Sequence, residues 1–157
     1  MSRKHIDKLP SIMPHIVDCV NGRHERKHIY GYQHIRYNTE TAVSDGVNDI
    51  DTHEINKNVS IVGCGTSSMT NGDNRSQILR INIPEPSEDN AGYFIYIKDE
   101  EGNCGNTGNG SYAPNTINVT YGPSYQQVHT ISEAHSFEVI YSTGTSWKRL
   151  TSSNLPP

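Results

Sequence analysis

The sequence predicts an all-β fold: a small antiparallel β-sandwich or barrel-like module with an extended N-terminal arm. Two stretches, 78–83 and 93–98, alternate their side chains with the period of two that is typical of strands with one buried face. Clusters of Gly, Pro, Asn and Asp separate the apolar stretches, as turns do in β-proteins. Only 32% of the residues are hydrophobic and 19% are charged, and this polar composition favours loop-rich β structure over helices.

The individual strands follow from the same alternation. Residues 29–37 place aromatic and polar side chains on one side of the chain and predict the first strand. The acidic and polar residues 38–58 predict at most a short strand between loops. Short strands at this spacing describe a sandwich or a small barrel. The remaining strands are expected at 59–62, 78–83, 93–98, 116–121, 127–131 and 137–141, with a closing edge near 147–150.

Turn chemistry predicts hairpins between neighbouring strands. Pro84 and Pro86 follow one predicted strand, and the segment 99–103, Asp-Glu-Glu-Gly-Asn, follows the next. We expect 99–103 to form a charged, solvent-exposed hairpin turn. A twelve-residue calcium loop would require alternating acids and a terminal Glu, which are absent here.

Charge divides the chain into a basic arm and an acidic body. Residues 1–36 contain seven Lys and Arg against three Asp and Glu, whereas residues 37–157 contain six against fourteen. We therefore assign 1–36 as a basic N-terminal arm with the first strand, and 37–157 as the β-sandwich body. Such an arm is expected to contact an acidic surface, the alternative being a solvated tail. Nucleic acid is not expected as the partner, because acids and prolines dilute the cations.

Residues 24–28, His-Glu-Arg-Lys-His, match the H-E-x-x-H pattern of zinc hydrolases. On a helix, His24 and His28 would lie one turn apart, and Glu25 would be placed to activate a bound water. The two basic residues inside the motif oppose this, because burying cations beside a dication is costly. We expect a solvated basic segment, with no catalytic residue, cofactor or metal. Incidental metal binding by this pair, aided by His34, is the alternative.

Cysteine usage and hydropathy indicate synthesis in a cytoplasm. Cys19, Cys64 and Cys104 form an odd set without Cys-x-x-Cys spacing, so no disulfide framework is expected. No signal-like apolar region follows Met1 and no long apolar run occurs, so neither secretion nor a membrane is indicated. Cys64 lies between two glycines without the strand-to-helix context of a nucleophile turn.

The second half of the chain carries a series of motifs. Residues 96–103 read Tyr-Ile-Lys-Asp-Glu-Glu-Gly-Asn, a Gly/Asn-rich loop follows, and 115–119 read Asn-Thr-Ile-Asn-Val. Residues 137–147 end the series with an aliphatic-x-Ser-x-Gly-x-x-Trp pattern. The series resembles a β module of tailed-bacteriophage virion proteins, found in tail fibres, tailspikes and head-surface proteins, often as trimers. The loop 104–114 is longer than the usual connection of that module, and residues 1–36 lie outside the resemblance.

The resemblance implies a non-enzymatic virion structural protein. A chain of 157 residues without a coiled coil or long shaft is small for a receptor-binding fibre and better sized for a capsid decoration, or cement, protein. We expect a homotrimer in the virion, made in the host bacterial cytoplasm, with the major capsid protein or tail components as partners. The expected docking residues are Arg3, Lys4, Lys8, Arg23, Arg26, Lys27, Tyr30, Tyr32 and Arg36.

Three other functions remain open. The same module family includes tail-fibre and neck-fibre adaptors, in which the arm would enter a tail socket. A carbohydrate-binding β-sandwich would need an exposed aromatic platform, for which the sequence offers Tyr30, Tyr32, Tyr121 and Tyr125. A zinc hydrolase acting through residues 24–28 is the last alternative.

Overall fold

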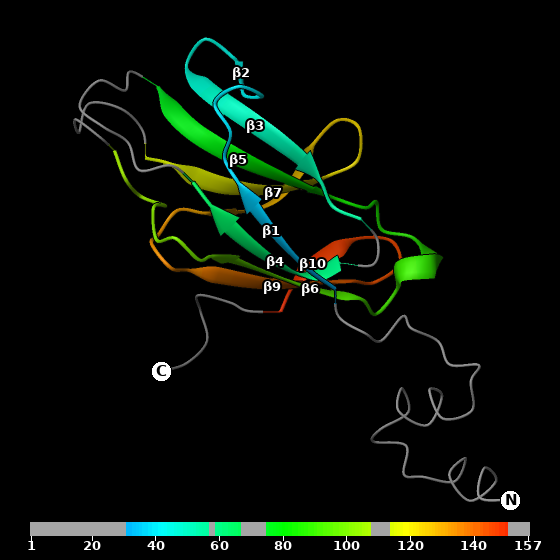
Figure 1. Cartoon of the computed structure of the whole chain (residues 1–157). Coiled ribbons are helices and arrows are strands. Elements are labelled where there is room, and N and C mark those ends of the chain that lie inside the picture. The colour runs from blue at the N-terminus through cyan, green and yellow to red at the C-terminus, as the bar shows by residue number, and fades with distance from the viewer. Residues whose placement is uncertain (1–30, 57–58, 67–74, 108–113, 151–157) are drawn as a thin grey trace, which may run out of the picture. The chain divides into compact units, whose positions relative to one another are not determined.

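The computed structural model describes residues 31–56, 59–66, 75–107 and 114–150 (Figure 1). The chain divides into two compact units, Met1–Gly31 and Tyr32–Pro157. The elements in chain order are β1 (Gly31–Arg36), β2 (Val43–Ser44), β3 (Asn48–Glu54), β4 (Val59–Gly65), β5 (Ser76–Ile83), the 3-10 helix η2 (Glu88–Asn90), β6 (Phe94–Asp99), β7 (Thr116–Tyr121), β8 (Gln126–Ile131), β9 (Phe137–Ser142) and β10 (Trp147–Arg149). None of the helical structure in these residues has the length and apolar character needed to span a bilayer.

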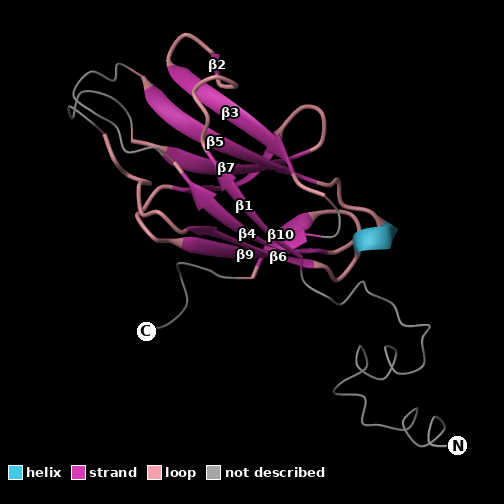
Figure 2. Cartoon of the chain, viewed as in Figure 1, coloured by secondary structure: helices cyan, strands magenta, loops and turns pink. Residues whose placement is uncertain are grey.

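The strands form two five-stranded sheets, and the prediction of an all-β sandwich is confirmed. Sheet A has the order β1-β4-β6-β9-β10, and sheet B has the order β2-β3-β5-β7-β8. Figure 2 shows the strands in two layers connected by loops, with the short helix at one end. One hydrophobic cluster takes its residues from both sheets, so the core lies between the layers.

The core is built by the alternation that the sequence displays. Leu79, Ile81 and Ile83 of β5 are buried, and Ile95 and Ile97 of β6 are buried opposite them in the other sheet. Each such aliphatic side chain stabilises the fold by roughly 1.5–3 kcal/mol through removal from water. The residues between them, such as Arg80 and Tyr96, point away from the core toward the outer sides of the two sheets.

Both sheets are mixed, so the expectation of an antiparallel module with simple hairpins is corrected. From β3 to β7 the chain alternates between sheet B and sheet A, and β5, β6 and β7 are each added parallel to the strand two before it in the chain. The pairs β3/β5, β5/β7 and β4/β6 are parallel. Antiparallel pairing joins β2 to β3, β7 to β8, β6 to β9, and β9 to β10.

The segment after β5 is a crossover between sheets. The strands β5 and β6 lie in different sheets, although the sequence predicted a hairpin between them. Asn90 fixes η2 in the crossover, because its side-chain amide donates to the Glu85 carbonyl at 2.7 Å and its Oδ1 accepts from the Ser142 hydroxyl at 2.7 Å. The Trp147 indole N–H donates to the Pro84 carbonyl at 2.8 Å.

The segment 99–103 is also a crossover, and the prediction of an exposed hairpin turn is wrong. Asp99 is fully buried. Its carboxylate accepts backbone N–H bonds from Gly102 at 3.1 Å, Cys104 at 3.0 Å and His135 at 3.2 Å. A buried carboxylate with several backbone donors fixes local chain direction, so Asp99 organises the passage from β6 to β7.

The N-terminal part of the body contains more strand than the sequence predicted. Residues 38–56 hold both β2 and the seven-residue β3, and β4 continues past Val62 to Gly65. Asp51 of β3 is buried and accepts hydrogen bonds from the Thr41 hydroxyl at 2.7 Å and the Asn38 N–H at 2.8 Å. These bonds attach the loop after β1 to sheet B.

Candidate functional site

The outer surface of sheet A is apolar where an outer strand face is usually polar. The register pairs Phe94 with Tyr141, and Tyr96 with Val139 on one side and Ile61 on the other. Residues paired in register point to the same side of a sheet, and these alternate with core residues. The "aromatic face" is defined as Ile61, Phe94, Tyr96, Phe137, Val139 and Tyr141.

The rings of the aromatic face contact one another and remain open to solvent. Phe94 and Tyr141 have ring centroids 6.1 Å apart, and Tyr96 and Phe137 stack with centroids 5.2 Å apart. Phe94 is 46% exposed and Phe137 is 50% exposed. A contiguous exposed apolar patch on a small protein marks an interaction surface more often than a solvated one.

Polar and charged residues border the aromatic face on two sides. Lys98 pairs in register with Phe137, and Lys148 pairs with Tyr141. At the opposite edge of sheet A from Lys148, β1 presents Tyr32, His34 and Arg36 on the same outer side, and all three are exposed. An apolar centre with a polar rim is the usual composition of a protein–protein interface.

The β1 side chains are held by two carboxylates of the β6–β7 crossover. Glu100 accepts a hydrogen bond from the Tyr32 hydroxyl at 2.8 Å and lies 3.5 Å from His34, and Glu101 pairs with Arg36. The hydrogen bond to Glu100 raises the pKa of Tyr32, because the phenolate would lose that bond. The charges at this edge of sheet A are therefore largely compensated within the chain.

The structure describes two of the nine expected docking residues. Tyr32 and Arg36 lie on the outer side of β1, beside His34, as the alternation predicted. Both are bonded to glutamates of the same chain, so they form part of the rim and not a free basic surface. The other seven, Arg3, Lys4, Lys8, Arg23, Arg26, Lys27 and Tyr30, lie outside the described residues.

Sequence reasoning missed Phe94 and Phe137 as surface residues, although a signal was present. Residues 94–97 read Phe-Ile-Tyr-Ile, and residues 139–141 read Val-Ile-Tyr, so these strands have no polar side. Strands that are apolar on both sides are normally covered on both sides. Only one side of sheet A is covered by sheet B.

The tyrosines considered for a carbohydrate platform do not lie together. Tyr30 is outside the described residues, and Tyr32 belongs to the rim of the aromatic face. Tyr121 packs against the core. Tyr125 follows β7 in a turn and lies on the outer side of sheet B, with its ring over Arg80.

The described residues also bear on the metal and cysteine expectations. Within them, no group of three or more His, Cys, Asp or Glu side chains is arranged to hold a metal ion, and the His24–His28 motif lies outside them.

Cys64 and Cys104 are free and buried. Burial raises the pKa of Cys104 to about 12 and also raises the pKa of Cys64, so neither thiol has the lowered pKa of a nucleophile.

Comparison with known proteins gives this chain no relative. No protein-family model, no curated protein and no solved structure matches it.

Proposed function

We propose that this protein is a non-enzymatic structural component of a virion, a capsid decoration protein that assembles through the aromatic face of sheet A. The aromatic face is the observation that carries the proposal. It combines exposed rings that already contact one another with a rim of lysines and carboxylates.

The geometry of the aromatic face favours a permanent partner. Its rings come from β6 and β9, two adjacent strands in the middle of a hydrogen-bonded sheet, so little conformational freedom is lost when a partner covers them. Large rigid aromatic side chains are also the residues that contribute most to protein–protein affinity. In the proposed assembly, three copies bury this face together.

The placement in a virion comes from the resemblance of residues 96–147 to phage virion β modules, together with the charge division of the chain. In the proposal, the basic residues 1–36 lie across acidic capsid subunits while the body forms the trimer. The arm supplies attachment and the aromatic face supplies assembly, so the two functions can be tested separately.

Co-sedimentation with particles tests the proposal. Purified protein is mixed with heads and with tails from virions that lack it, and bound protein is measured after centrifugation. Binding to heads is expected. Binding to tails alone would replace the decoration function with the tail-fibre or neck-fibre adaptor, and binding to neither would overturn the virion proposal.

A double variant, Phe94→Ser with Phe137→Ser, tests the aromatic face. It should sediment as a monomer, whereas a matched control, Val47→Ser in the β2–β3 turn, should assemble normally. Val47 is a suitable control because its side chain is exposed and lies in a turn between two strands of sheet B, away from the aromatic face. If the double variant assembles as the unmodified protein does, the aromatic face is not the assembly surface.

A further inference from the structure

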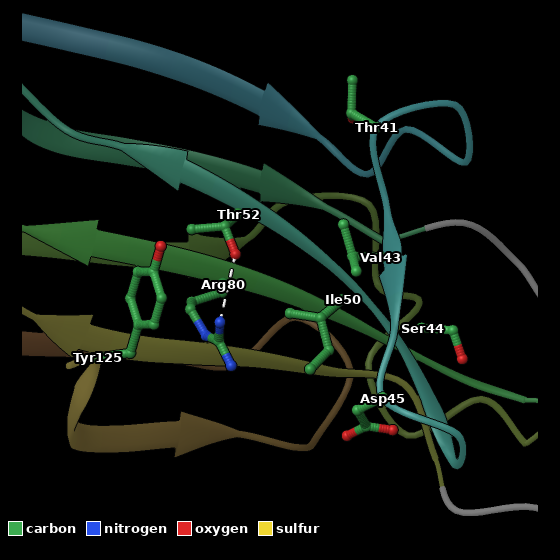
Figure 3. Close-up of a pocket in the computed structure, with 8 residues that line it drawn as sticks. All are labelled: Thr41, Val43, Ser44, Asp45, Ile50, Thr52, Arg80 and Tyr125. Carbon is green, nitrogen blue, oxygen red and sulfur yellow. Dashed lines mark hydrogen bonds between the residues drawn. The ribbon is translucent and has the colours of Figure 1, made fainter. Parts of the chain in front are cut away.

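A groove of about 350 Å³ crosses the outer side of sheet B, on the opposite side of the sandwich from the aromatic face. Its volume falls within the range of about 300–1,000 Å³ that small-molecule sites occupy. Figure 3 shows Arg80 beside Tyr125 in this groove, with Ile50 between Arg80 and the strand that carries Val43. We call this groove the Arg80 groove; it is lined by Thr41, Val43, Ser44, Asp45, Ile50, Thr52, Arg80 and Tyr125.

Arg80 is the positively charged residue of the groove lining, and no charged partner of it lies among the described residues. It alternates with the buried residues Leu79 and Ile81, so its side chain points away from the core. No carboxylate among the described residues forms an ion pair with it, and its one hydrogen bond to a described residue is a long one to the Thr52 hydroxyl at 3.4 Å. Its Nε is buried without a partner in the described part of the chain.

This state of Arg80 is unusual because a guanidinium carries five N–H donors. Leaving a buried donor such as the Nε N–H unpaired is energetically costly. A planar carboxylate would accept two parallel N–H bonds from the guanidinium and would satisfy the geometry and the charge together. A ligand with one carboxylate is therefore the best match to Arg80.

Asp45 lies in the same groove but is committed to its own turn. Its carboxylate accepts N–H bonds from Val47 at 2.8 Å and from the backbone of Asn48 at 2.6 Å, and a third bond from the Asn48 side chain at 3.1 Å. Asp45 adds a negative charge at the end of the groove where Ser44 lies (Figure 3). A polyanion such as a nucleic acid would meet repulsion there, whereas a ligand with a single carboxylate need not approach Asp45.

Tyr125 gives the groove an aromatic wall at the position of the cation. The Arg80 Cζ lies 4.4 Å from the centroid of the Tyr125 ring, and that ring is 40% exposed. Tyr125 holds a left-handed φ of 52°, a backbone conformation that is unfavourable for residues other than glycine. The turn keeps this strained residue in the place where its ring fixes the guanidinium.

The remaining lining residues favour a saccharide over a peptide. The Thr41 hydroxyl donates to Asp51, whereas the Ser44 and Thr52 hydroxyls accept bonds from Arg75 and Arg80 and can still donate to a ligand. Val43 and Ile50 add apolar surface, and the mixture suits a ring with alternating hydroxyls and C–H groups. A peptide bound by strand addition would need a long free edge, but β2 at this edge has only two residues.

We propose that the Arg80 groove binds a carboxylate-bearing saccharide, with Arg80 pairing to the carboxylate and Tyr125 packing against the sugar ring. The groove and the aromatic face lie on opposite sides of the sandwich, so the protein can bind this ligand while it is assembled on a particle. The proposal does not depend on the docking function.

Two probes that differ in one group test the ligand class. The full chain is titrated with methyl glucuronoside and with methyl glucoside, in which a hydroxymethyl group replaces the carboxylate, and amide and side-chain resonances are followed by NMR. Resonances of Thr52, Arg80 and Tyr125 should shift with the glucuronoside, with an affinity at least about tenfold above that for the glucoside. Equal affinity for the two probes, or no shift with either, would overturn the proposal.

Variants locate the binding and keep the test independent of folding. Arg80→Gln and Arg80→Lys should each lose about tenfold or more in affinity, because Gln lacks the charge and Lys lacks the two-pronged geometry. Tyr125→Asn tolerates the left-handed φ, so it should fold at least as stably while losing affinity. Glu133→Gln, at an exposed position in the turn between β8 and β9, should bind as the unmodified protein does.

An acidic dipeptide completes the set of probes. If the dipeptide binds the groove more tightly than the glucuronoside, the ligand is a peptide carboxylate and the saccharide proposal fails. If all variants bind the glucuronoside equally, the sugar binds elsewhere and the assignment of the Arg80 groove fails. Neither result would affect the assembly test, which depends on Phe94 and Phe137.

Discussion

The Glu100 carboxylate lies in the space that Gly63 leaves on the outer side of sheet A, where it accepts the hydrogen bond from the Tyr32 hydroxyl at 2.8 Å. A side chain at Gly63 would collide with that carboxylate. The glycine of β4 therefore allows a residue of the β6–β7 crossover to reach β1, two strands away in sheet A. The same arrangement recurs one step along, where Glu101 lies over Gly65 and pairs with Arg36.

This relationship predicts the titration of Tyr32. Its pKa is raised first by the hydrogen bond to Glu100 and also by the charge of that carboxylate. In Glu100→Gln the charge is absent and the neutral amide oxygen is a weaker hydrogen-bond acceptor than the carboxylate, so the pKa of Tyr32 should fall toward its ordinary value of about 10. The measurement is a pH titration of the ring carbons of Tyr32 by NMR.

Glu101→Gln is the matched control for Tyr32, because Glu101 occupies the equivalent position over Gly65 but bonds to Arg36. The titration of Tyr32 should be nearly unchanged in this variant. An equal shift in both variants would mean that general electrostatics, and not the bond to Glu100, controls Tyr32.

Much of the fold could be predicted because the core strands carry an uninterrupted alternation. Leu79, Ile81 and Ile83 define β5, and Ile95 and Ile97 define β6, so both strands and their inward faces were predicted correctly. Strand direction could not be predicted. A turn sequence shows that the chain reverses, but not whether the next strand joins the same sheet or the opposite one.

β3 was missed because its inward positions are polar. Asp51 is buried in a network with Thr41 and Asn38, and the alternation rule recognises only apolar buried residues. The Arg80 groove was beyond sequence reasoning for another reason. Arg80 and Tyr125 meet only because parallel pairing in sheet B places β5 beside the turn after β7.

The buried Asp51 predicts a loss of stability in acid. Burial raises the pKa of Asp51, but the hydrogen bonds from Thr41, His53 and Asn38 outweigh it, so the pKa is lowered overall. A lowered native pKa means that the ionised carboxylate stabilises the fold above the unfolded pKa of about 3.9, and that this stability is lost as pH falls through the native value.

The variant Asp51→Asn tests this linkage. At pH 7 it should be less stable by roughly 1–3 kcal/mol, because the amide cannot replace the carboxylate as an acceptor of all its bonds. The difference from the unmodified protein should shrink below about pH 4 as Asp51 itself becomes protonated. Chemical denaturation at several pH values measures both, with Asp49→Asn on the same strand as the control. A pH-independent difference would contradict the linkage.

The ion pair between Arg149 and Glu138 predicts a large effect at the last strand. Glu138 is buried and accepts two bonds from Arg149, at 2.9 Å from both Nε and Nη2, and His129 lies 3.2 Å away. Removing one partner of a fully buried pair typically costs about 3–5 kcal/mol, and because Arg149 is 38% exposed the cost here should lie at or below the lower end of that range. Arg149→Gln should approach the lower value because His129 still faces Glu138.

A double-mutant cycle separates the pair from its parts. Arg149→Gln with Glu138→Gln should be more stable than Arg149→Gln alone, because the buried charge that has lost its Arg149 bonds is removed as well. Denaturant unfolding of the four proteins gives the coupling free energy. Additive effects of the two substitutions would show that the two side chains act independently.

The aromatic face predicts that thermal stability depends on protein concentration. If copies cover one another's aromatic faces, dilution should lower the melting temperature by mass action. The double variant Phe94→Ser, Phe137→Ser should melt at a temperature that does not change with concentration. Calorimetry across a hundredfold range of concentration measures this, and a concentration-independent melting temperature for the unmodified protein would exclude assembly through any surface.

The buried cysteines predict that thiol labelling reports global unfolding. In a Cys19→Ser background, Cys64 and Cys104 are the remaining thiols, and both are buried between the sheets. With its pKa raised to about 12, Cys104 is a thiolate in only about one molecule in ten thousand at pH 8. Neither thiol should react with a maleimide or an aromatic disulfide until denaturant unfolds the sandwich, when both should react together. Rapid labelling of one thiol in native buffer would show that the sheets separate locally at that end, because a buried thiol can react only through opening of the structure that covers it.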